Sequence, residues 1–200
     1  MSLAAFSAAM RVCDPTLEEH AARVAAHAEA VARRLGWSDE RLGSVALGAA
    51  LHDVGKVNTR PEVLAKPAAL DEDEVQHVRA HPVEGAWLVA GVASLRAALP
   101  YVLFHHERWD GRGYPTGRAR TEIPVEGRLL AVVDAFDAMT SPRPYREALP
   151  AHEALYELDR HAGTQFDPEI AEVFAAAWEA GEIGALSTGP QAAAGATAVC

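Results

Sequence analysis

Residues 105–115 read HHERWDGRGYP and mark the point where a predicted helix ends and a loop begins. The loop continues to Ile123, because Gly111, Gly113, Pro115 and Gly117 carry turn chemistry between two long predicted helices. The other informative segment, LHDVGK at 51–56, lies about fifty residues upstream. Imidazole and carboxylate together form a nitrogen and oxygen ligand set that suits iron, manganese, zinc or nickel. The two segments therefore predict a metal site for hydrolysis.

On both sides of that loop, apolar residues recur at helical spacing, and no alternating strand pattern competes. A single stripe comprises Leu17, Ala21, Val24, Ala28, Val31 and Leu35. Ser38 is expected to cap the next helix, which runs to His52 and is broken at Gly55. Further helices are expected at about 71–80, 82–91 (with Pro82 in the first turn), 94–106, 124–140, 151–162 and 168–180. The predicted fold class is therefore all-α.

Composition limits the class of protein and its partners. The chain has 200 residues, half of them apolar, which is one ordinary domain with a large core. A net charge of −10 disfavours nucleic acid polymers and anionic membranes, and no apolar stretch is long enough to span a bilayer. Cys13 and Cys200 give no sulfur metal site, and disulfides are not expected. Without a secretory signal, the expected location is cytoplasmic.

Several motifs in order give the chain a resemblance to HD-GYP domains, the branch of the HD superfamily of metal-dependent phosphohydrolases associated with cyclic di-GMP hydrolysis. They are HAARVA from His20, LHDVGK from Leu51, KPAAL from Lys66, HPVEG from His81, HHERWDGRGYP from His105, the segment from Ile123 to Leu149, and GTQFDP from Gly163. The resemblance covers about 14–178 and implies a bundle of about seven to eight helices. We assign the domain to 1–185 and expect 186–200 to be a disordered tail.

The metal ligands follow partly from chemistry and partly from the resemblance. Asp53 has two oxygens and can therefore bridge two cations. Two cations held side by side can clamp both the attacking and the leaving oxygen in phosphoryl transfer. The resemblance implies that His20, His52, Asp53 and Asp134 hold one metal, and that Asp53, His81, His105 and His106 hold the other. Asp137 is expected to support or cap and not to ligate. The remaining histidines fall on no motif position, namely His27, His77, His152 and His161.

The expected centre is dinuclear, with iron or manganese as its most natural metals and zinc or nickel as alternatives. Some family members carry a glutamate four residues before the first histidine ligand and hold a third metal. Thr16 occupies that position here, and Glu18 and Glu19 stand at other spacings. We interpret those two acids as first-turn residues that complement the helix dipole.

Substrate contacts are expected from cations and from the GYP loop. Lys56 either offsets a helix dipole or reaches a substrate phosphate, and it is assigned with Asp53 to catalysis. Arg143 and Arg146 match family positions that contact phosphates, where a planar guanidinium fork is well suited. The resemblance places Tyr114 at the substrate site, and either Tyr114 or Trp109 could stack on guanine.

The predicted function is hydrolysis of cyclic di-GMP to pGpG, GMP or both, by a water that two metals activate. One alternative is a phosphohydrolase of another nucleotide or cyclic dinucleotide. A second alternative is a catalytically idle nucleotide-binding module. No attached input domain is expected, because the first predicted helix begins near the start of the chain. A homodimer or a regulatory protein partner stays open.

Overall fold

The computed structural model describes residues 17–142 and 147–184, and within them it contains helices and no strand. The α-helices are α2 (Leu17–Arg34), α3 (Asp39–Leu51), α4 (Pro61–Leu64), α5 (Glu72–Arg79), α6 (His81–Ala90), α7 (Leu99–Phe104), α8 (Val125–Thr140), α9 (Ala151–Arg160) and α10 (Pro168–Glu179). Three 3-10 segments separate some of them: η1 (Val54–Asn58), η2 (Ala93–Ala98) and η3 (Arg120–Glu122). The predicted all-α class is confirmed.

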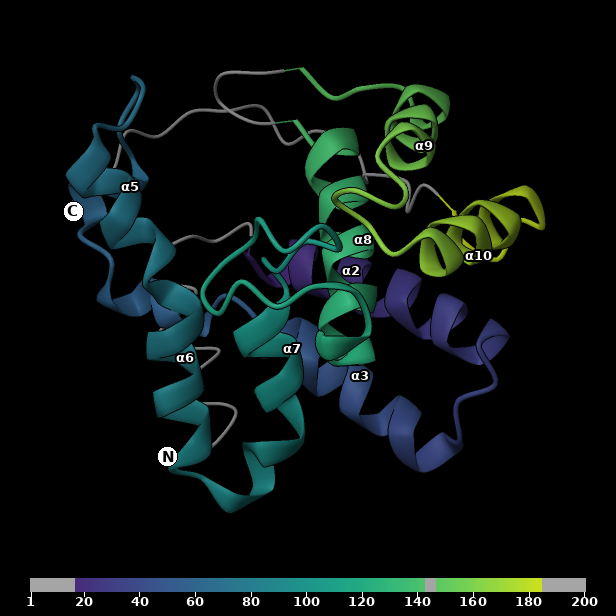
Figure 1. The fold of residues 1–200 in the computed structure, drawn as a ribbon, viewed down its shortest axis with the longest axis horizontal. Coiled ribbons are helices and arrows are strands. Elements are labelled where there is room, and N and C mark those ends of the chain that lie inside the picture. Colours follow the sequence, from purple (N-terminus) through teal and green to yellow (C-terminus); the bar gives the residue numbers. More distant parts are fainter. Residues whose placement is uncertain (1–16, 143–146, 185–200) are drawn as a thin grey trace.

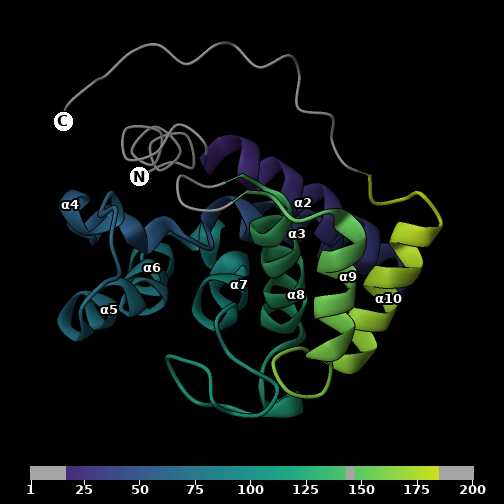
Figure 2. The ribbon, with the colours of Figure 1, turned by 90° about the horizontal axis from the view of Figure 1, so that it is seen from above.

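Helix α8 is the centre of the bundle (Figure 1), with α5, α6 and α7 on one side and α9 and α10 on the other. In Figure 2, α8, α9 and α10 run side by side. The main core forms where apolar faces of α2, α3, α8, α9 and α10 meet, and Phe136 and Phe174 pack at its centre with their rings 4.8 Å apart. Val24, Ala28 and Val31 of the predicted stripe are fully buried there.

A second, smaller core lies under the other half of the molecule. It is formed by Leu51, Val54, Val89, Leu95, Ala98 and Val102. These residues come from α3, η1, α6, η2 and α7, so this core fixes the ends of the helices that carry the histidines.

Local signals explain where the helices begin. Ser38 caps α3 by accepting a hydrogen bond from the Arg41 amide, as predicted. Asp71 and Glu74 form a capping box at the start of α5. The segment predicted as one helix over 94–106 is two segments in the structure, η2 and α7. Pro100 stands in the first turn of α7, where its missing N–H and its ring prevent a continuous helix from passing through.

Within the described ranges, no helix combines the length and the apolar character that crossing a membrane requires.

Candidate metal centre

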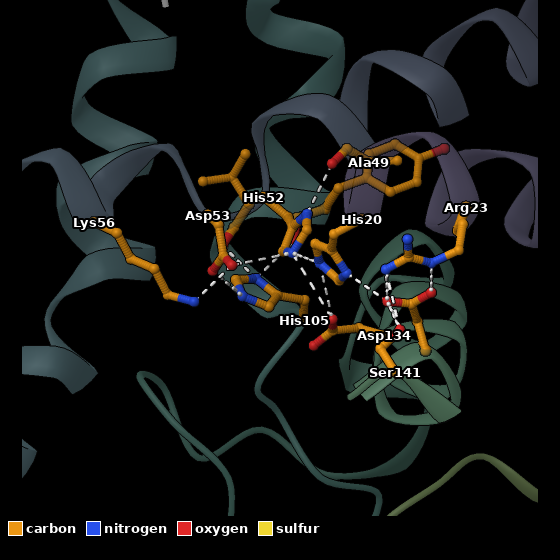
Figure 3. Close-up of polar contacts among 12 residues, drawn as sticks. His20, Arg23, Ala49, His52, Asp53, Lys56, His105, Asp134 and Ser141 are labelled. Carbon is orange, nitrogen blue, oxygen red and sulfur yellow. Dashed lines mark hydrogen bonds and ion pairs between the residues drawn. The ribbon is translucent and has the colours of Figure 1, made fainter. Parts of the chain in front are cut away.

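Seven histidine and aspartate side chains from five parts of the fold converge on one region. Figure 3 shows His20, His52, Asp53, His105 and Asp134 of this set. Most of them come from helix ends, where side chains can point beyond the helix. His52 follows α3 directly, His81 opens α6, and His105 follows α7. The region therefore depends on how these ends are packed together, and the complete set is His20, His52, Asp53, His81, His105, His106 and Asp134.

One cluster contains Asp53, His81, His105 and His106, whose ligand atoms all lie within 4.8 Å of one another. The Nε2 atoms of His81 and His105 are 3.2 Å apart. The His81 Nε2 atom lies 3.3 Å from Asp53 Oδ1. This arrangement matches one of the two expected ligand sets.

The second cluster contains His20, His52 and Asp134. The Nε2 atoms of His20 and His52 are 3.3 Å apart, and the His20 Nε2 atom lies 3.3 Å from Asp134 Oδ1. Helix α2 supplies His20 and helix α8 supplies Asp134, so this cluster joins α2 to the central helix.

Asp53 stands between the two clusters and turns a different oxygen to each. Its Oδ1 atom faces His81, whereas its Oδ2 atom lies 3.4 Å from the Nε2 atom of His52. This is the geometry that a bridging carboxylate needs.

Hydrogen bonds of three Nδ1 atoms show how these histidines are oriented. The Nδ1 atoms of His52, His81 and His105 lie 2.8, 2.7 and 2.9 Å from the carbonyl oxygens of Ala49, Val78 and Val102. A carbonyl only accepts, so each Nδ1 must donate its N–H. In the neutral ring, Nε2 then carries a lone pair. Facing lone pairs repel, and a cation between them removes that repulsion, so the donor set fits a metal.

Burial and charge set the protonation of this region. Burial lowers the pKa of His105 well below its usual range and lowers that of His106 to about 4. Burial alone would raise the pKa of Asp53, but Lys56 and His52 reverse this and hold that pKa well below its usual range. Burial alone would lower the pKa of His52, but Asp53, together with Asp134 and the Ala49 carbonyl, raises it to about 9. A fixed negative charge among imidazoles favours a bound cation.

Asp137, expected to support and not to ligate, supports His20. Its Oδ2 atom lies 2.7 Å from the Nδ1 atom of His20, and its Oδ1 atom accepts from Arg23 Nε at 2.6 Å. Burial opposes ionisation, yet His20 and Arg23 hold the pKa of Asp137 below its usual range. A carboxylate behind a histidine fixes the tautomer and strengthens the ring nitrogen as a ligand. Arg23 was not singled out from the sequence; its place three residues after His20, on the same helix face, is the available signal.

Gly55 has a different role from the helix break predicted for it, because it lies inside η1. A Cβ atom at this position would be 2.0 Å from the carbonyl oxygen of His81. Only glycine allows η1 to approach the first turn of α6 so closely, and this contact brings Asp53 and His81 together.

The GYP loop is tied to the dihistidine segment by Glu107. This buried carboxylate accepts hydrogen bonds at one oxygen from the amide and the hydroxyl of Thr116 (2.6 and 2.7 Å) and from the amide of Gly117 (3.2 Å). The loop is also held by the GTQFDP segment, since the amide of Asp110 donates to the carbonyl of Thr164. Sequence reasoning missed Glu107; its place directly after His106 is the signal that could have found it.

Of the expected substrate residues, two face the clusters. The ring of Tyr114 stacks on His106 at 4.8 Å and 25°. Lys56 donates to Asp53 Oδ2 at 2.6 Å, as the dashed line in Figure 3 shows. Trp109 instead has the guanidinium of Arg128 over its ring, 5.8 Å from the centroid.

Thr16, Arg143 and Arg146 are outside the described residues. His27 is a core residue whose ring packs against those of Phe136 and Phe174, and His77 accepts a hydrogen bond from the Arg60 amide. Neither of these two histidines belongs to either cluster.

The chain is similar to known proteins over most of its length. A family model described as "HD domain" matches residues 7–170. A "Cyclic di-GMP phosphodiesterase" of Thermotoga maritima is 36% identical over 163 residues, which are 80% of this chain and 44% of that protein. A "3'3'-cGAMP-specific phosphodiesterase 3" of Vibrio cholerae is 34% identical over 165 residues, which are 82% of this chain and 36% of that protein. The chain therefore spans less than half the length of these curated relatives.

The fold is also similar to a solved structure. The crystal structure of a cyclic GMP-AMP specific phosphodiesterase of V. cholerae (V-cGAP3) matches with a TM-score of 0.68 at 19% identity, covering 88% of this chain and 48% of that chain. At that identity, the match concerns the arrangement of helices alone.

Proposed function

Because this chain belongs to the HD-domain family, in its HD-GYP branch, we propose that it is a metal-dependent phosphodiesterase that hydrolyses cyclic di-GMP to pGpG, GMP or both. The observation that carries the proposal is the pair of adjoining clusters around Asp53. Two adjacent divalent cations are a recurring device for displacement at phosphorus, and this ligand set offers places for two.

In this proposal iron or manganese would be held by His20, His52, Asp53 and Asp134 on one side and by Asp53, His81, His105 and His106 on the other. When bound, such cations supply Lewis acidity towards phosphate oxygens and make water more acidic.

The chain itself contributes orientation and charge. Hydrogen bonds from their Nδ1 atoms to carbonyl oxygens and to Asp137 hold the rings of His20, His52, His81 and His105 so that their Nε2 atoms face one region. The Lys56 ammonium lies beside Asp53 with its side chain 30% exposed, so a phosphate oxygen arriving from solvent can reach it. We assign Lys56 to stabilising phosphate charge and to protonating the leaving 3' oxygen.

A second candidate substrate is 3'3'-cGAMP, because the V. cholerae relative that is 34% identical is named a 3'3'-cGAMP-specific phosphodiesterase. Both nucleotides are cyclic dinucleotides with two phosphodiester bonds, so the metal clusters alone do not discriminate between them. A catalytically idle binding module would be favoured by a missing ligand, and all seven expected side chains are present.

The test is anaerobic purification with metal analysis, followed by chromatography of the products formed from cyclic di-GMP and from 3'3'-cGAMP. We expect two metals per chain and cleavage that stops when the metals are chelated. Equal cleavage of both substrates by metal-free protein would overturn the proposal.

Arg143 and Arg146 are tested in the same assay. Replacing both with alanine should leave the metal content unchanged, since the resemblance gives them no place among the metal ligands. Substrate affinity and turnover should fall, about tenfold to a hundredfold for each lost charge-assisted contact. Unchanged kinetic constants would show that the two arginines do not bind phosphate.

A further inference from the structure

Arg79 lies at the edge of the metal centre and has no role so far. It is the last residue of α5, two residues before His81. Its guanidinium carbon is 5.2 Å from the centroid of the Tyr114 ring. That ring stacks on His106, with centroids 4.8 Å apart. The three side chains therefore form a stack that begins inside the histidine cluster and ends at an exposed cation.

Among the described residues, no acid pairs with the guanidinium of Arg79. On this acidic chain other arginines pair closely with carboxylates; Arg23 and Arg41, for example, lie 2.6 Å from Asp137 and Glu126. Within residues 17–142 and 147–184, no carboxylate lies at ion-pair distance from Arg79. Its N–H donors are available to an anion arriving at the His81 and His106 side of the clusters.

The stack also indicates which part of a substrate would be met there. The stacked His106 ring occupies one face of the Tyr114 ring, which leaves the opposite face for the Arg79 guanidinium that lies over the same ring. A nucleobase could then stack on Tyr114 only by displacing Arg79. A guanidinium held flat on an aromatic ring still offers its N–H edge, and that planar fork matches two oxygens of a phosphate.

We propose that Arg79 binds the phosphate of a cyclic dinucleotide that is not being hydrolysed, while the other phosphate lies at the metal clusters. This inference rests on the proposed function and extends it to a specificity-determining residue. A substrate with two phosphates gains this contact, and a substrate with one phosphate cannot use it.

The test compares Arg79→Ala with the wild-type protein on cyclic di-GMP, 3'3'-cGAMP and the single-phosphate diester bis(p-nitrophenyl) phosphate. The KM for both cyclic dinucleotides should rise about tenfold, with a smaller change in kcat. The rise should exceed that for the single-phosphate diester by about fivefold or more. Arg79→Lys should restore part of the loss, because a point charge lacks the fork.

The matched control is Arg96→Ala, which removes the same charge from an exposed position. Arg96 donates a hydrogen bond to the carbonyl of Ala90, the last residue of α6. Ala90 lies roughly 14 Å from His81, the first residue of that helix, because an α-helix rises about 1.5 Å per residue. Its KM values should stay within about twofold of wild type, since it lies beyond the reach of a direct contact. Metal content is measured for every variant.

Three results for Arg79→Ala would overturn the role of Arg79 and leave the proposed function untouched. They are KM values equal to those of the Arg96→Ala control, a rise in KM for only one of the two cyclic dinucleotides, and an equal rise in KM for the single-phosphate diester. A wild-type protein that cleaves this diester but neither cyclic dinucleotide would overturn the proposed function and this inference with it.

Discussion

Asp53 is the residue on which both clusters depend, because each of its oxygens faces a different set of histidines. Asp53→Ala and Asp53→Asn should both lose most of the bound metal and most of the activity. The fall in metal affinity and in activity should exceed the roughly 10–100-fold that is typical when a residue that only orients a ligand is replaced. Elemental analysis measures the metal, and circular dichroism should find the helix content largely intact. Two metals per chain in either variant would contradict the bridging role.

Asp137 tests how much a supporting carboxylate contributes at the same scale. Asp137→Asn removes the charge behind His20 and should weaken metal binding by about 10–100-fold, as measured by competition with a chelator. Ser141→Ala is the control, because it removes one neutral partner of the same carboxylate and should have a small effect. Metal affinity equal to wild type in Asp137→Asn would show that the Arg23 and Asp137 pair serves stability only.

At the scale of elements, Glu107 joins the end of α7 to the GYP loop through three hydrogen bonds to one oxygen. Glu107→Ala should lower the free energy of unfolding by about 1.5 kcal/mol, because the carboxylate that accepts three hydrogen bonds from the loop is lost. Hydrogen exchange at the Thr116 and Gly117 amides should become faster. Glu107→Gln keeps an acceptor oxygen and should retain most of the protection. Unchanged exchange in Glu107→Ala would mean that other contacts hold the loop.

Glycines decide how closely the elements approach. A Cβ on Gly48 would lie 2.3 Å from the Tyr101 ring, and one on Gly127 would lie 2.5 Å from Phe104. Helix α7 is therefore packed tightly between α3 and α8, and the two histidines that follow it are placed by those contacts.

For the whole molecule, His27 links stability to pH. Its side chain packs in the main core and is 5% exposed, and its Nδ1 atom has no hydrogen-bond partner among the described residues. Burial lowers the pKa of this imidazole. His27 therefore takes up a proton less readily in the folded state than in the unfolded state, where the pKa of a histidine is about 6.5. Stability from His27 is therefore present above about pH 6.5 and is lost as the pH falls below it, by at most about 1.4 kcal/mol per pH unit.

Denaturation of metal-free wild type and His27→Leu between pH 7.5 and 5 tests this, with the exposed His152→Leu as control. The His27 variant should lose stability less steeply on acidification than the wild type and the control do. Parallel slopes in all three proteins would show that His27 does not contribute to the pH dependence.

The sequence by itself determined the helical class, most helix positions and the residues expected to act. Periodicity is a local property, so α2, α3 and α8 could be predicted from their own residues, and the motif order indicated the family. The convergence of the metal-binding side chains could not be predicted from neighbouring residues. His20 and Asp134 are separated by more than a hundred residues, and packing of α2 on α8 brings His20 Nε2 to 3.3 Å from Asp134 Oδ1. The same holds for Glu107, for Arg79 over Tyr114, and for Gly55, whose approach to His81 depends on a neighbouring helix. Tertiary structure decided these features because side-chain contacts between distant segments depend on three-dimensional packing, which local spacing does not specify.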